Sequence, residues 1–366
     1  MVKFLDLHHQ YTTIKDDIDR AIAAVIHDAA FIHGKYARQF EEHFAAYLHV
    51  KHCVGVGNGT DALEIAIEAL DLPPESEIIV PANSFIASAE AVSRTGHHVV
   101  FCDCQPENYT LSTEDLSRKL SEKTKAVIAV HLYGHPVDMD ALHTLCQPRH
   151  IRIIEDCAQA HGAEYKGTRV GTLGDIGTFS FYPGKNLGAY GDAGAIVTND
   201  EALARRCRMI ANHGRITKYD HEFEGRNSRL DGLQAAILSA KLPHLDRWIA
   251  ARRAIAQQYR DMLREVKGII TPHEEAWAKH AYHLFVIRAE QRDHLQEYLK
   301  QHEIQTGIHY PIALPKLQAY RHLHQTTSTV MANQFDSQIL SLPIGEHLSQ
   351  ENVEFVVQKL QAFYSR

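Results

Sequence analysis

The stretch that decides the fold runs from Asp175 to Asn199, DIGTFSFYPGKNLGAYGDAGAIVTN. Two β-prone runs, Ile176–Tyr182 and Ala193–Thr198, flank a glycine-rich loop that carries a single lysine, Lys185. Glycine lets a backbone approach a ligand closely, and two flanking strands would hold the lysine amine in place. A glycine hairpin with a solvated lysine accounts for this stretch as well as a lysine that forms a Schiff base with a carbonyl cofactor. The two interpretations are distinguished by whether the upstream chain supplies the remaining contacts for a cofactor.

Composition excludes several classes of protein. With 366 residues, the chain is long enough for one large domain and a smaller one. The net charge of −7, without any basic stripe, argues against a partner nucleic acid. The N-terminus lacks the apolar core of a signal peptide, and no apolar run approaches the ~20 residues of a transmembrane helix. We therefore expect a cytoplasmic protein with no membrane partner.

Cysteine and histidine usage predicts neither disulfides nor a metal. The six cysteines of so long a chain indicate reduced thiols rather than a disulfide framework. Cys102 and Cys104 lie close in sequence, but nothing completes a ligand set around them, so core packing is the better interpretation. His131 and His135 enclose a glycine and precede a proline, which argues against a shared helix face.

Strand-like and helical runs alternate along the first half of the chain, after two helical runs at Ile14–Val25 and Ala37–Leu48. This alternation predicts an α/β domain with a mostly parallel sheet between helices, which binds ligands beyond the carboxyl ends of its strands. The strand-like runs are His52–Val56, Glu77–Val80, His98–Cys102, Ala126–Val130 and Ile151–Glu155; helical runs at Ala87–Arg94, Thr113–Leu120 and Met139–Leu145 separate most of them.

A long helical stretch, Leu230–Leu263, is interrupted by Pro243 and links this domain to a smaller one. The smaller one contains a strand at Phe285–Arg288 and helices at Asp293–His302 and Glu351–Tyr364. We predict a large cofactor-binding α/β domain over residues 1–245, including the N-terminal helical segment, and a small α+β domain over residues 246–366.

Two pieces of a binding site precede the lysine loop. The turn from Gly57 to Asp61 opens a helix, so that free amides, the helix dipole and the Thr60 hydroxyl can hold an anion; helix capping by Asp61 with Glu64 is the alternative. Phe85 follows a strand at the carboxyl edge of the sheet, where an aromatic ring can stack on a flat heterocycle. Ordinary core packing is the alternative for Phe85.

A third piece is the acidic strand end at Asp156, with Gln159 and His161 close behind. A buried carboxylate is costly without a cationic partner, and a protonated pyridine nitrogen is such a partner; capping of a helix is the alternative. Ser180 adds a hydroxyl donor for a phosphate near Lys185. Because phosphate anchor, stacking ring, acidic strand end and lysine occur together, we predict a pyridoxal 5'-phosphate site.

Seven segments together resemble the DegT/StrS family of nucleotide-sugar aminotransferases, and the resemblance runs from about Phe4 to the C-terminus. It implies the aspartate-aminotransferase fold, fold type I of pyridoxal-phosphate enzymes, and a homodimer with active sites at the subunit interface. The segments are GNGTDALEIAIEAL, PANSFIASAEAV, HLYGHPVDMDAL, IIEDCAQAHGAEYKG, FSFYPGKNLGAYGDAGAIVTND, GRNSRLDGLQAAIL and LSLPIGEHLSQENVEFVV.

The resemblance also assigns roles to single residues. Lys185 matches the Schiff-base lysine and Asp156 the partner of the pyridine nitrogen. Asn227 matches an asparagine that reaches the phosphate in the partner subunit, although the family often has tyrosine where this chain has Ser228. The remaining matches are Gln159 near the ring hydroxyl, Gly59, Thr60 and Ser180 at the phosphate, Phe85 as the stacking aromatic, and His309 and Tyr310 near the sugar nucleotide.

Three further residues are candidates for substrate contacts. His161 and Tyr182 neighbour the site in sequence, and a contact with the sugar and a structural hydrogen bond explain them equally well. Arg229 can bind a carboxylate or phosphate because a guanidinium forks onto either; a structural salt bridge explains it as well.

The segment SFYPGKNLGAYGDAGA, residues 180–195, resembles the corresponding sequence of enzymes that act on dTDP-linked 3-keto-6-deoxyhexoses. The resemblance implies ping-pong transfer of an amino group from L-glutamate to C3 of such a sugar, through pyridoxamine 5'-phosphate. A 4-keto-sugar aminotransferase shares all of this chemistry. A related sugar dehydratase is disfavoured because those enzymes carry histidine where this chain has Lys185. A non-catalytic pyridoxal-binding regulatory protein is the alternative from another class.

Overall fold

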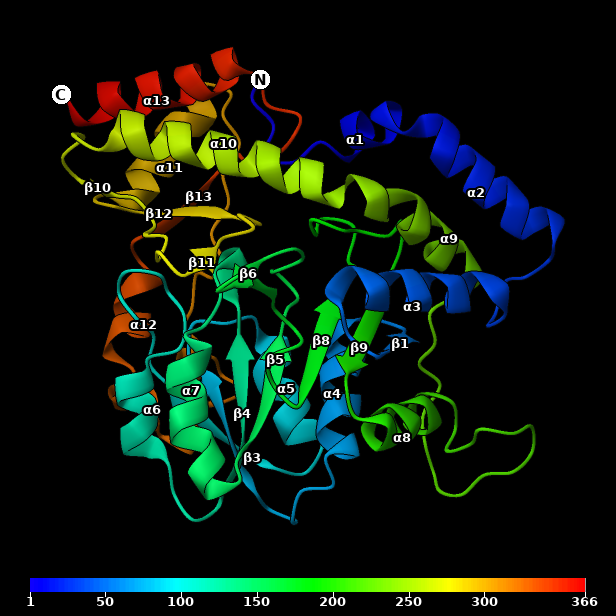
Figure 1. The fold of residues 1–366 in the computed structure, drawn as a ribbon. Coiled ribbons are helices and arrows are strands. Elements are labelled where there is room, and N and C mark those ends of the chain that lie inside the picture. Colours follow the sequence, from blue (N-terminus) through cyan, green and yellow to red (C-terminus); the bar gives the residue numbers. More distant parts are fainter. Residues whose placement is uncertain (366) are drawn as a thin grey trace.

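Short runs of β-branched and other apolar residues form a seven-stranded sheet at the centre of the chain (Figure 1). The computed structural model describes residues 1–365. The strand order is β1-β9-β8-β5-β4-β2-β3, and β3, β2, β4, β5 and β8 pair in parallel. The bounds are β1 (His52–Val56), β2 (Glu77–Pro81), β3 (His98–Cys102), β4 (Thr124–Val130), β5 (Arg152–Asp156), β8 (Ile176–Ser180) and β9 (Gly194–Thr198).

Helices cover both faces of this sheet, as predicted for an α/β fold. Successive strand residues point to opposite faces: Ile153 packs in one buried cluster and Ile154 in the other. One cluster holds α3 (Lys35–Leu48), α6 (Thr113–Lys119), α7 (Met139–Cys146) and α9 (Gly232–Lys241). The other holds α4 (Gly59–Ala69), α5 (Ile86–Arg94), α8 (Glu201–Ala211) and α12 (Val330–Phe335).

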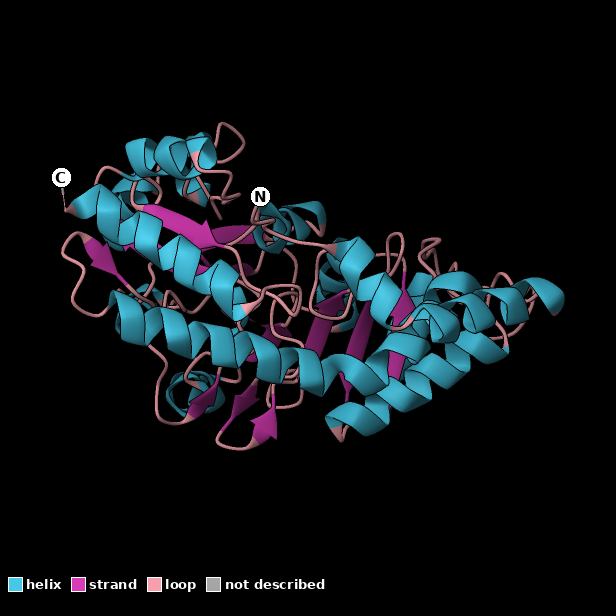
Figure 2. Cartoon of the chain, turned by 90° about the horizontal axis from the view of Figure 1, so that it is seen from above, coloured by secondary structure: helices cyan, strands magenta, loops and turns pink. Residues whose placement is uncertain are grey.

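A second, antiparallel sheet lies in the C-terminal part of the chain. It has the order β10-β12-β13 and packs against three helices, and seen from above the strands lie beneath long helices (Figure 2). Its elements are β10 (Ile269–Ile270), β12 (Phe285–Ala289), β13 (Ile339–Leu342), α10 (Leu245–Leu263), α11 (Arg292–Gln301) and α13 (Gln350–Tyr364). Pro243 lies in a short 3-10 turn, Leu242–His244, between α9 and α10, as expected for a residue that interrupts a helix.

A third, small sheet ties the two parts of the chain together. It pairs β11 (Ala278–Lys279) with β6 (Glu164–Tyr165), which pairs in turn with β7 (Thr168–Arg169). The division into residues 1–245 and 246–366 stays a prediction.

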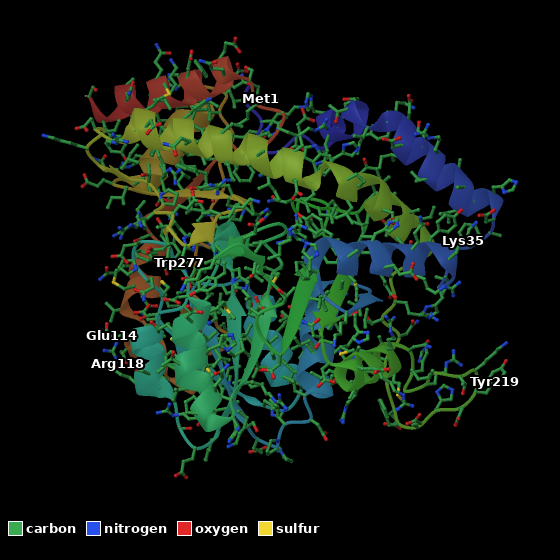
Figure 3. The ribbon with its side chains drawn as sticks, viewed as in Figure 1. Met1, Lys35, Glu114, Arg118, Tyr219 and Trp277 are labelled. Carbon is green, nitrogen blue, oxygen red and sulfur yellow. The ribbon has the colours of Figure 1, made fainter. Side chains whose placement is uncertain are left out.

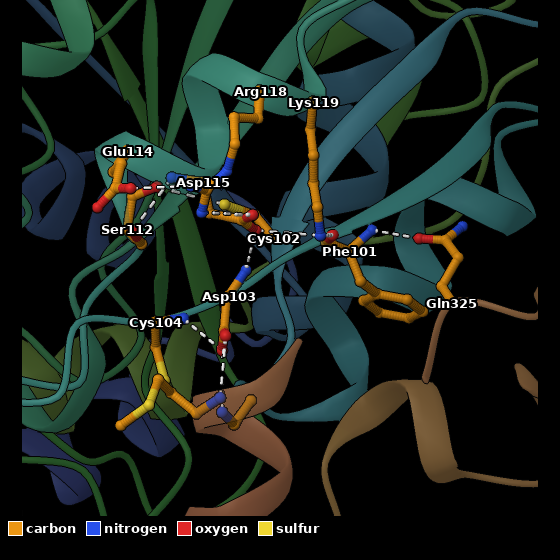
Figure 4. Close-up of polar contacts among 12 residues, drawn as sticks. Phe101, Cys102, Asp103, Cys104, Ser112, Glu114, Asp115, Arg118, Lys119 and Gln325 are labelled. Carbon is orange, nitrogen blue, oxygen red and sulfur yellow. Dashed lines mark hydrogen bonds and ion pairs between the residues drawn. The ribbon is translucent and has the colours of Figure 1, made fainter. Parts of the chain in front are cut away.

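The free edge of the large sheet, at β3, is covered by side chains (Figure 4). Gln325 accepts a hydrogen bond from the Phe101 amide at 2.7 Å and donates one to the Val99 carbonyl at 2.9 Å. Asp103 accepts from the Met331 and Ala332 amides, both at 2.9 Å. These contacts satisfy backbone groups of Val99 and Phe101 on an edge that would otherwise be more open to strand pairing, and they fasten the α12 segment beside it.

The N-terminal helices α1 (Leu7–Thr13) and α2 (Lys15–His27) lie along one side of the molecule, with α2 against α9. The loop that carries Tyr219 and helix α12 lie at opposite ends of the large sheet, and this loop projects away from the sheet (Figure 3). All six cysteines are buried and free. Across residues 1–365, no helix has the length and apolarity that a membrane crossing requires.

Candidate active site

The carboxyl ends of β5 and β8 open into a cavity of about 850 Å³. Asp156, Ser180 and Lys185 line it from the large sheet, and His283 and His309 line it from the C-terminal part of the chain. Parallel sheets bind ligands at this edge. The topology therefore brings together residues that are more than a hundred positions apart in sequence.

Asp156 is the last residue of β5 and is buried. Its Oδ2 accepts a hydrogen bond from Ser88 Oγ at 2.9 Å, and its Oδ1 accepts from the Ala158 amide at 3.1 Å. Burial raises the pKa of this carboxyl group, an effect that these bonds and the Lys185 charge oppose. No helix begins directly after Asp156, so the helix-capping alternative does not apply. A cationic ligand group would relieve the desolvated carboxylate.

Lys185 lies in the loop after β8, where its amide donates to the Tyr182 carbonyl at 2.8 Å. Desolvation lowers the pKa of the Lys185 amine to about 8, against the opposing charge of Asp156. An amine with that pKa is partly neutral near physiological pH, and the neutral form is the nucleophile. Lys185 is half-buried and lines the cavity together with Asp156, so its side chain is not that of a lysine on an open hairpin surface.

Contacts from other elements fix the lysine loop. Lys241, fully buried on α9, donates its Nζ proton to the Gly188 carbonyl at 2.7 Å. The Asn186 amide nitrogen donates to the Ala281 carbonyl at 3.0 Å, and the Tyr190 amide donates to Gln234 Oε1 at 2.8 Å. Sequence reasoning missed Lys241, because a lysine inside a helical run reads as a solvated side chain.

An anion cradle lies between α4 and β8. Asn58, not Asp61, is the N-cap of α4, and its Oδ1 accepts from the Asp61 amide at 2.8 Å. Gly59 and Thr60 occupy the first turn, where helix amides have no intrahelical acceptor, and both line the cavity with Ser180. A Cβ on Gly59 would lie 2.5 Å from the Ser180 Cβ, so the cradle has room only for glycine there.

At position 228, where the family often has tyrosine, this chain has a serine that forms two hydrogen bonds. Its buried hydroxyl donates to Asp61 Oδ2 at 2.6 Å and accepts from the Gly57 amide at 2.9 Å. The serine thus ties the segment around Asn227 to the turn that opens α4.

An aromatic ring and an amide face the space between cradle and acid. Phe85 is 52 % exposed, so it is not a core residue, and it lines the cavity 5.5 Å from the Tyr310 ring. Gln159 donates from Nε2 to the Tyr310 hydroxyl at 3.0 Å and accepts from the Tyr133 amide at 2.7 Å. A flat heterocycle can stack on the exposed Phe85 face.

The remaining predicted residues divide into two groups. Tyr182, His309 and Tyr310 line the cavity. Burial lowers the pKa of His309 to about 4, so its ring is neutral at physiological pH. His161 lies outside the cavity-lining set, 1 % exposed, with its ring 5.5 Å from those of Phe179 and Phe181.

Asn227 and Arg229 also lie outside the cavity-lining set of this chain. Asn227 is exposed and forms a backbone bridge with Asn212. Arg229 is half-buried beside His33, whose pKa is lowered by burial and by the Arg229 charge. The contact of Asn227 with a partner subunit stays a prediction.

Several cavity residues were not found by sequence reasoning. Phe4 and Leu5 reach the cavity from the N-terminus, and Ser88 holds Asp156 from α5. Arg252 on α10 is buried, and its NH1 donates to the carbonyls of Tyr282, His283 and Ile344. Phe4, Leu5 and Arg252 lie outside the seven quoted segments, and nothing in PANSFIASAEAV marks Ser88 as a partner of Asp156, so their proximity to the lysine had no sequence signal.

A buried cluster of His131, Glu155 and Cys157 lies behind the site. Glu155 accepts hydrogen bonds from His131 Nε2 and from the Gly171, Leu173 and Gly174 amides, at 2.6 to 3.0 Å. Both carboxylate oxygens already have donors, so this cluster is explained as a structural network.

The donors fit pyridoxal 5'-phosphate. The cradle at Gly59 matches a phosphate, the exposed Phe85 matches an aromatic ring, and the desolvated Asp156 matches a protonated ring nitrogen. A partly neutral lysine beside these groups can attach to an aldehyde. Fold and site together define a pyridoxal-phosphate enzyme of the aminotransferase type.

Comparisons with known proteins agree. Residues 12–361 match the DegT/DnrJ/EryC1/StrS aminotransferase family, and the chain belongs to this family. It is 45 % identical to the erythromycin biosynthesis sensory transduction protein EryC1 of Saccharopolyspora erythraea, over 99 % of each chain. It is 42 % identical to the dTDP-3-amino-3,4,6-trideoxy-alpha-D-glucose transaminase of Streptomyces venezuelae, over 100 % of this chain and 97 % of the relative.

Solved structures give the same result. The crystal structure of S. venezuelae DesV in complex with a ketimine intermediate matches with a TM-score of 0.97 and 42 % identity, over 100 % of this chain and 99 % of that one. A further match, with a TM-score of 0.93 and 30 % identity, carries bound cofactor PMP. The protein is a pyridoxal-phosphate-dependent sugar aminotransferase, and its fold class is the one predicted from sequence.

Proposed function

We propose that this enzyme transfers an amino group from L-glutamate to C3 of a dTDP-linked 3-keto-6-deoxyhexose, in a ping-pong reaction through pyridoxamine 5'-phosphate. The observation that carries the proposal is the full-length similarity, at 42 % identity, to a transaminase named for a dTDP-3-amino sugar. The placement of Lys185 and Asp156 in one cavity of about 850 Å³ supports it, because a nucleotide sugar needs such a volume.

The residues of the site have separate roles in this reaction. When bound, the cofactor supplies an electron sink that makes the α-hydrogen of the donor acidic. Asp156 keeps the ring nitrogen protonated, and Gly59, Thr60 and Ser180 hold the phosphate. Lys185 in its neutral form would take the proton from the donor α-carbon and pass it to the cofactor, and in the second half-reaction it would move a proton from the cofactor to C3 of the keto sugar.

The surroundings of Lys185 favour this role. Because burial already lowers the pKa of its amine to about 8, the freed side chain is a base of suitable strength near neutral pH. Tyr182, His309 and Tyr310 contact the sugar nucleotide from the cavity wall. His161 packs against Phe179 and Phe181 behind the site, and Arg229 binds a carboxylate or phosphate.

The enzyme works as a cytoplasmic homodimer in this proposal. Asn227 lies on the surface, outside the cavity of its own chain, as expected for a residue that completes the phosphate site of a partner. The six free thiols suit a reducing compartment. Sedimentation analysis of the holoenzyme tests the dimer.

The experiment that tests the reaction is incubation of the holoenzyme with L-glutamate and a panel of dTDP- and UDP-linked 3-keto and 4-keto sugars. Mass spectrometry detects the added amine, and NMR of the product locates it at C3 or C4. Amination at C4 alone would replace this proposal with the 4-keto alternative, and a preference for UDP sugars would correct the nucleotide.

A regulatory role without catalysis is the second candidate, because a relative at 45 % identity is named a sensory transduction protein. The presence of Lys185 and Asp156 in one cavity argues against it. Stopped-flow absorbance during addition of glutamate to the cofactor-loaded protein decides: a regulatory protein leaves the spectrum unchanged, whereas an aminotransferase converts the bound cofactor.

A further inference from the structure

The first six residues form a strap, here called the N-terminal strap (residues 1–6), that reaches the cavity. Val2 pairs with the segment around Ile304: its amide donates to the Glu303 carbonyl at 2.8 Å, and its carbonyl accepts from the Gln305 amide at 3.0 Å. The Phe4 amide donates to Gln305 Oε1 at 3.1 Å. The strap is therefore hydrogen-bonded to the C-terminal part of the chain.

Its other end is fixed as well. His347 Nε2 donates to the Lys3 carbonyl at 3.0 Å. Asp6 is the N-cap of α1 and accepts from the His9 amide at 3.0 Å. Because both ends are held, the strap does not behave as a fraying terminus, and the side chains between them have defined positions.

Those side chains are Phe4 and Leu5, which both line the cavity. A Cβ on Gly184 would lie 3.5 Å from Leu5 Cδ2, so Leu5 sits beside the residue that precedes Lys185. Phe4 stacks on the ring of His309, with centroids 5.8 Å apart and an angle of 17° between planes. The strap thus forms an apolar wall close to the reacting amine.

This wall keeps part of its apolar surface uncovered. Leu5 is 37 % exposed although it lies in a cavity rather than on a convex surface. Covering an exposed apolar side chain in a binding cavity contributes most to the binding free energy when the ligand group that covers it is also apolar. Glutamate carries a charge at each end, whereas a 6-deoxy sugar presents a methyl group.

We propose that Phe4 and Leu5 are specificity-determining residues that contact the C6 methyl group of a 6-deoxy sugar substrate. This inference rests on the proposed function, because it concerns the sugar that the second half-reaction takes. A hydroxymethyl group at the same place would put its hydroxyl against apolar carbon, with loss of hydration.

The test compares two dTDP-linked 3-keto hexoses that differ only in the 6-deoxy and 6-hydroxy substituents. We expect the wild-type holoenzyme to favour the 6-deoxy sugar in kcat/KM by about 10- to 100-fold, the range of a single small group in an apolar pocket. Leu5→Ala and Phe4→Ala should each reduce this ratio several-fold, by lowering kcat/KM for the 6-deoxy sugar alone. The rate of the glutamate half-reaction is measured for each variant as well, so that a loss confined to the sugar half-reaction can be recognised.

Two control variants make the result specific. Leu5→Met keeps an apolar side chain of similar volume and should keep the ratio. Ile270→Ala truncates an exposed apolar side chain of β10 that does not line the cavity and should change neither substrate. Thermal unfolding of each variant verifies that the fold is intact.

The outcomes separate this inference from the proposed function. If the wild-type enzyme converts both sugars and neither Leu5→Ala nor Phe4→Ala changes the ratio of the two kcat/KM values, the assignment of the strap is wrong and the proposed function stands. Equal losses on both sugars overturn it too, because they indicate a general effect on binding. A wild-type enzyme that aminates neither 3-keto sugar refutes the proposed function, and the assignment of the strap falls with it.

Discussion

Gly59 at the start of α4 and Ser180 at the end of β8 lie so close that a Cβ on the glycine would be 2.5 Å from the Ser180 Cβ. Atoms that near cannot coexist without a backbone shift. The close approach places the first-turn amides of the helix and the serine hydroxyl on one side of the cavity, which is the arrangement a phosphate requires.

Gly59→Ala should therefore weaken cofactor binding and cost about 1–3 kcal/mol of unfolding free energy, the usual effect of overpacking. Fluorescence titration with pyridoxal phosphate and thermal unfolding measure the two effects. Adding Ser180→Gly removes the clashing carbon, so the double variant should regain stability but not affinity, because the hydroxyl is lost. Unchanged cofactor affinity in Gly59→Ala would contradict the cradle.

Lys185→Ala should abolish the yellow chromophore of the lysine-bound cofactor and lower turnover by at least the ~10²–10⁴ of a lost acid–base group. The fold should survive, since the substitution removes a desolvated ammonium group. Absorbance spectra and borohydride trapping followed by peptide mapping test this. Transamination at the wild-type rate would show that another residue is the base.

Asp156→Asn keeps the shape of the side chain but removes its charge. The amide cannot hold a proton on the ring nitrogen, so turnover should fall by about 10²–10³. Its single oxygen can accept from the Ala158 amide, while its NH2 group takes the place of Oδ2 and can donate to the Ser88 hydroxyl. Burial already opposes the charge of this carboxylate, so the cofactor-free variant should unfold at no lower temperature. Single-turnover kinetics with glutamate measures the rate, and calorimetry measures the unfolding temperature. A normal rate would exclude the pairing of Asp156 with the ring nitrogen.

The rate at which cofactor attaches to the cofactor-free protein should rise with pH and level off above about 8. Burial lowers the pKa of Lys185 from 10.5 to about 8, and only the neutral amine attacks an aldehyde. Stopped-flow growth of the chromophore measures this profile. Lys241, whose pKa burial also lowers to about 8, provides the control: Lys241→Gln removes this amine but keeps a side-chain donor for the Gly188 carbonyl, so the midpoint should stay in place. A rate that climbs steadily to pH 10 would contradict a desolvated Lys185.

Gln325→Ala should destabilise the edge of the large sheet without touching the site. The substitution leaves the Phe101 amide and the Val99 carbonyl without their side-chain partner, at a cost of about 1–3 kcal/mol. Urea unfolding measures the loss, and hydrogen exchange should localise it to β3. Gln361→Ala, which removes one exposed hydrogen bond on α13, is the matched control and should be nearly neutral.

Much of the fold was predictable because its elements have strong local patterns. β1 and β3 have the predicted bounds, and the break at Pro243 lies between α9 and α10. Hydrophobic periodicity and proline act over a few residues, so they can be read from the chain. The antiparallel pairing of β1 with β9 was not predicted, because strand partners are chosen by long-range packing.

The chain alone determined the chemistry. Lys185 in its glycine loop, Asp156 at a strand end and the Gly59–Thr60 turn are local motifs, since their function requires fixed neighbours in sequence. Tertiary structure decided what surrounds them. Phe4 and Leu5 reach the cavity that Lys185 lines, and Lys241 reaches the lysine loop, only because the parallel sheet collects distant segments at one edge. Desolvation, which lowers the pKa of Lys185, likewise exists only once those segments have packed.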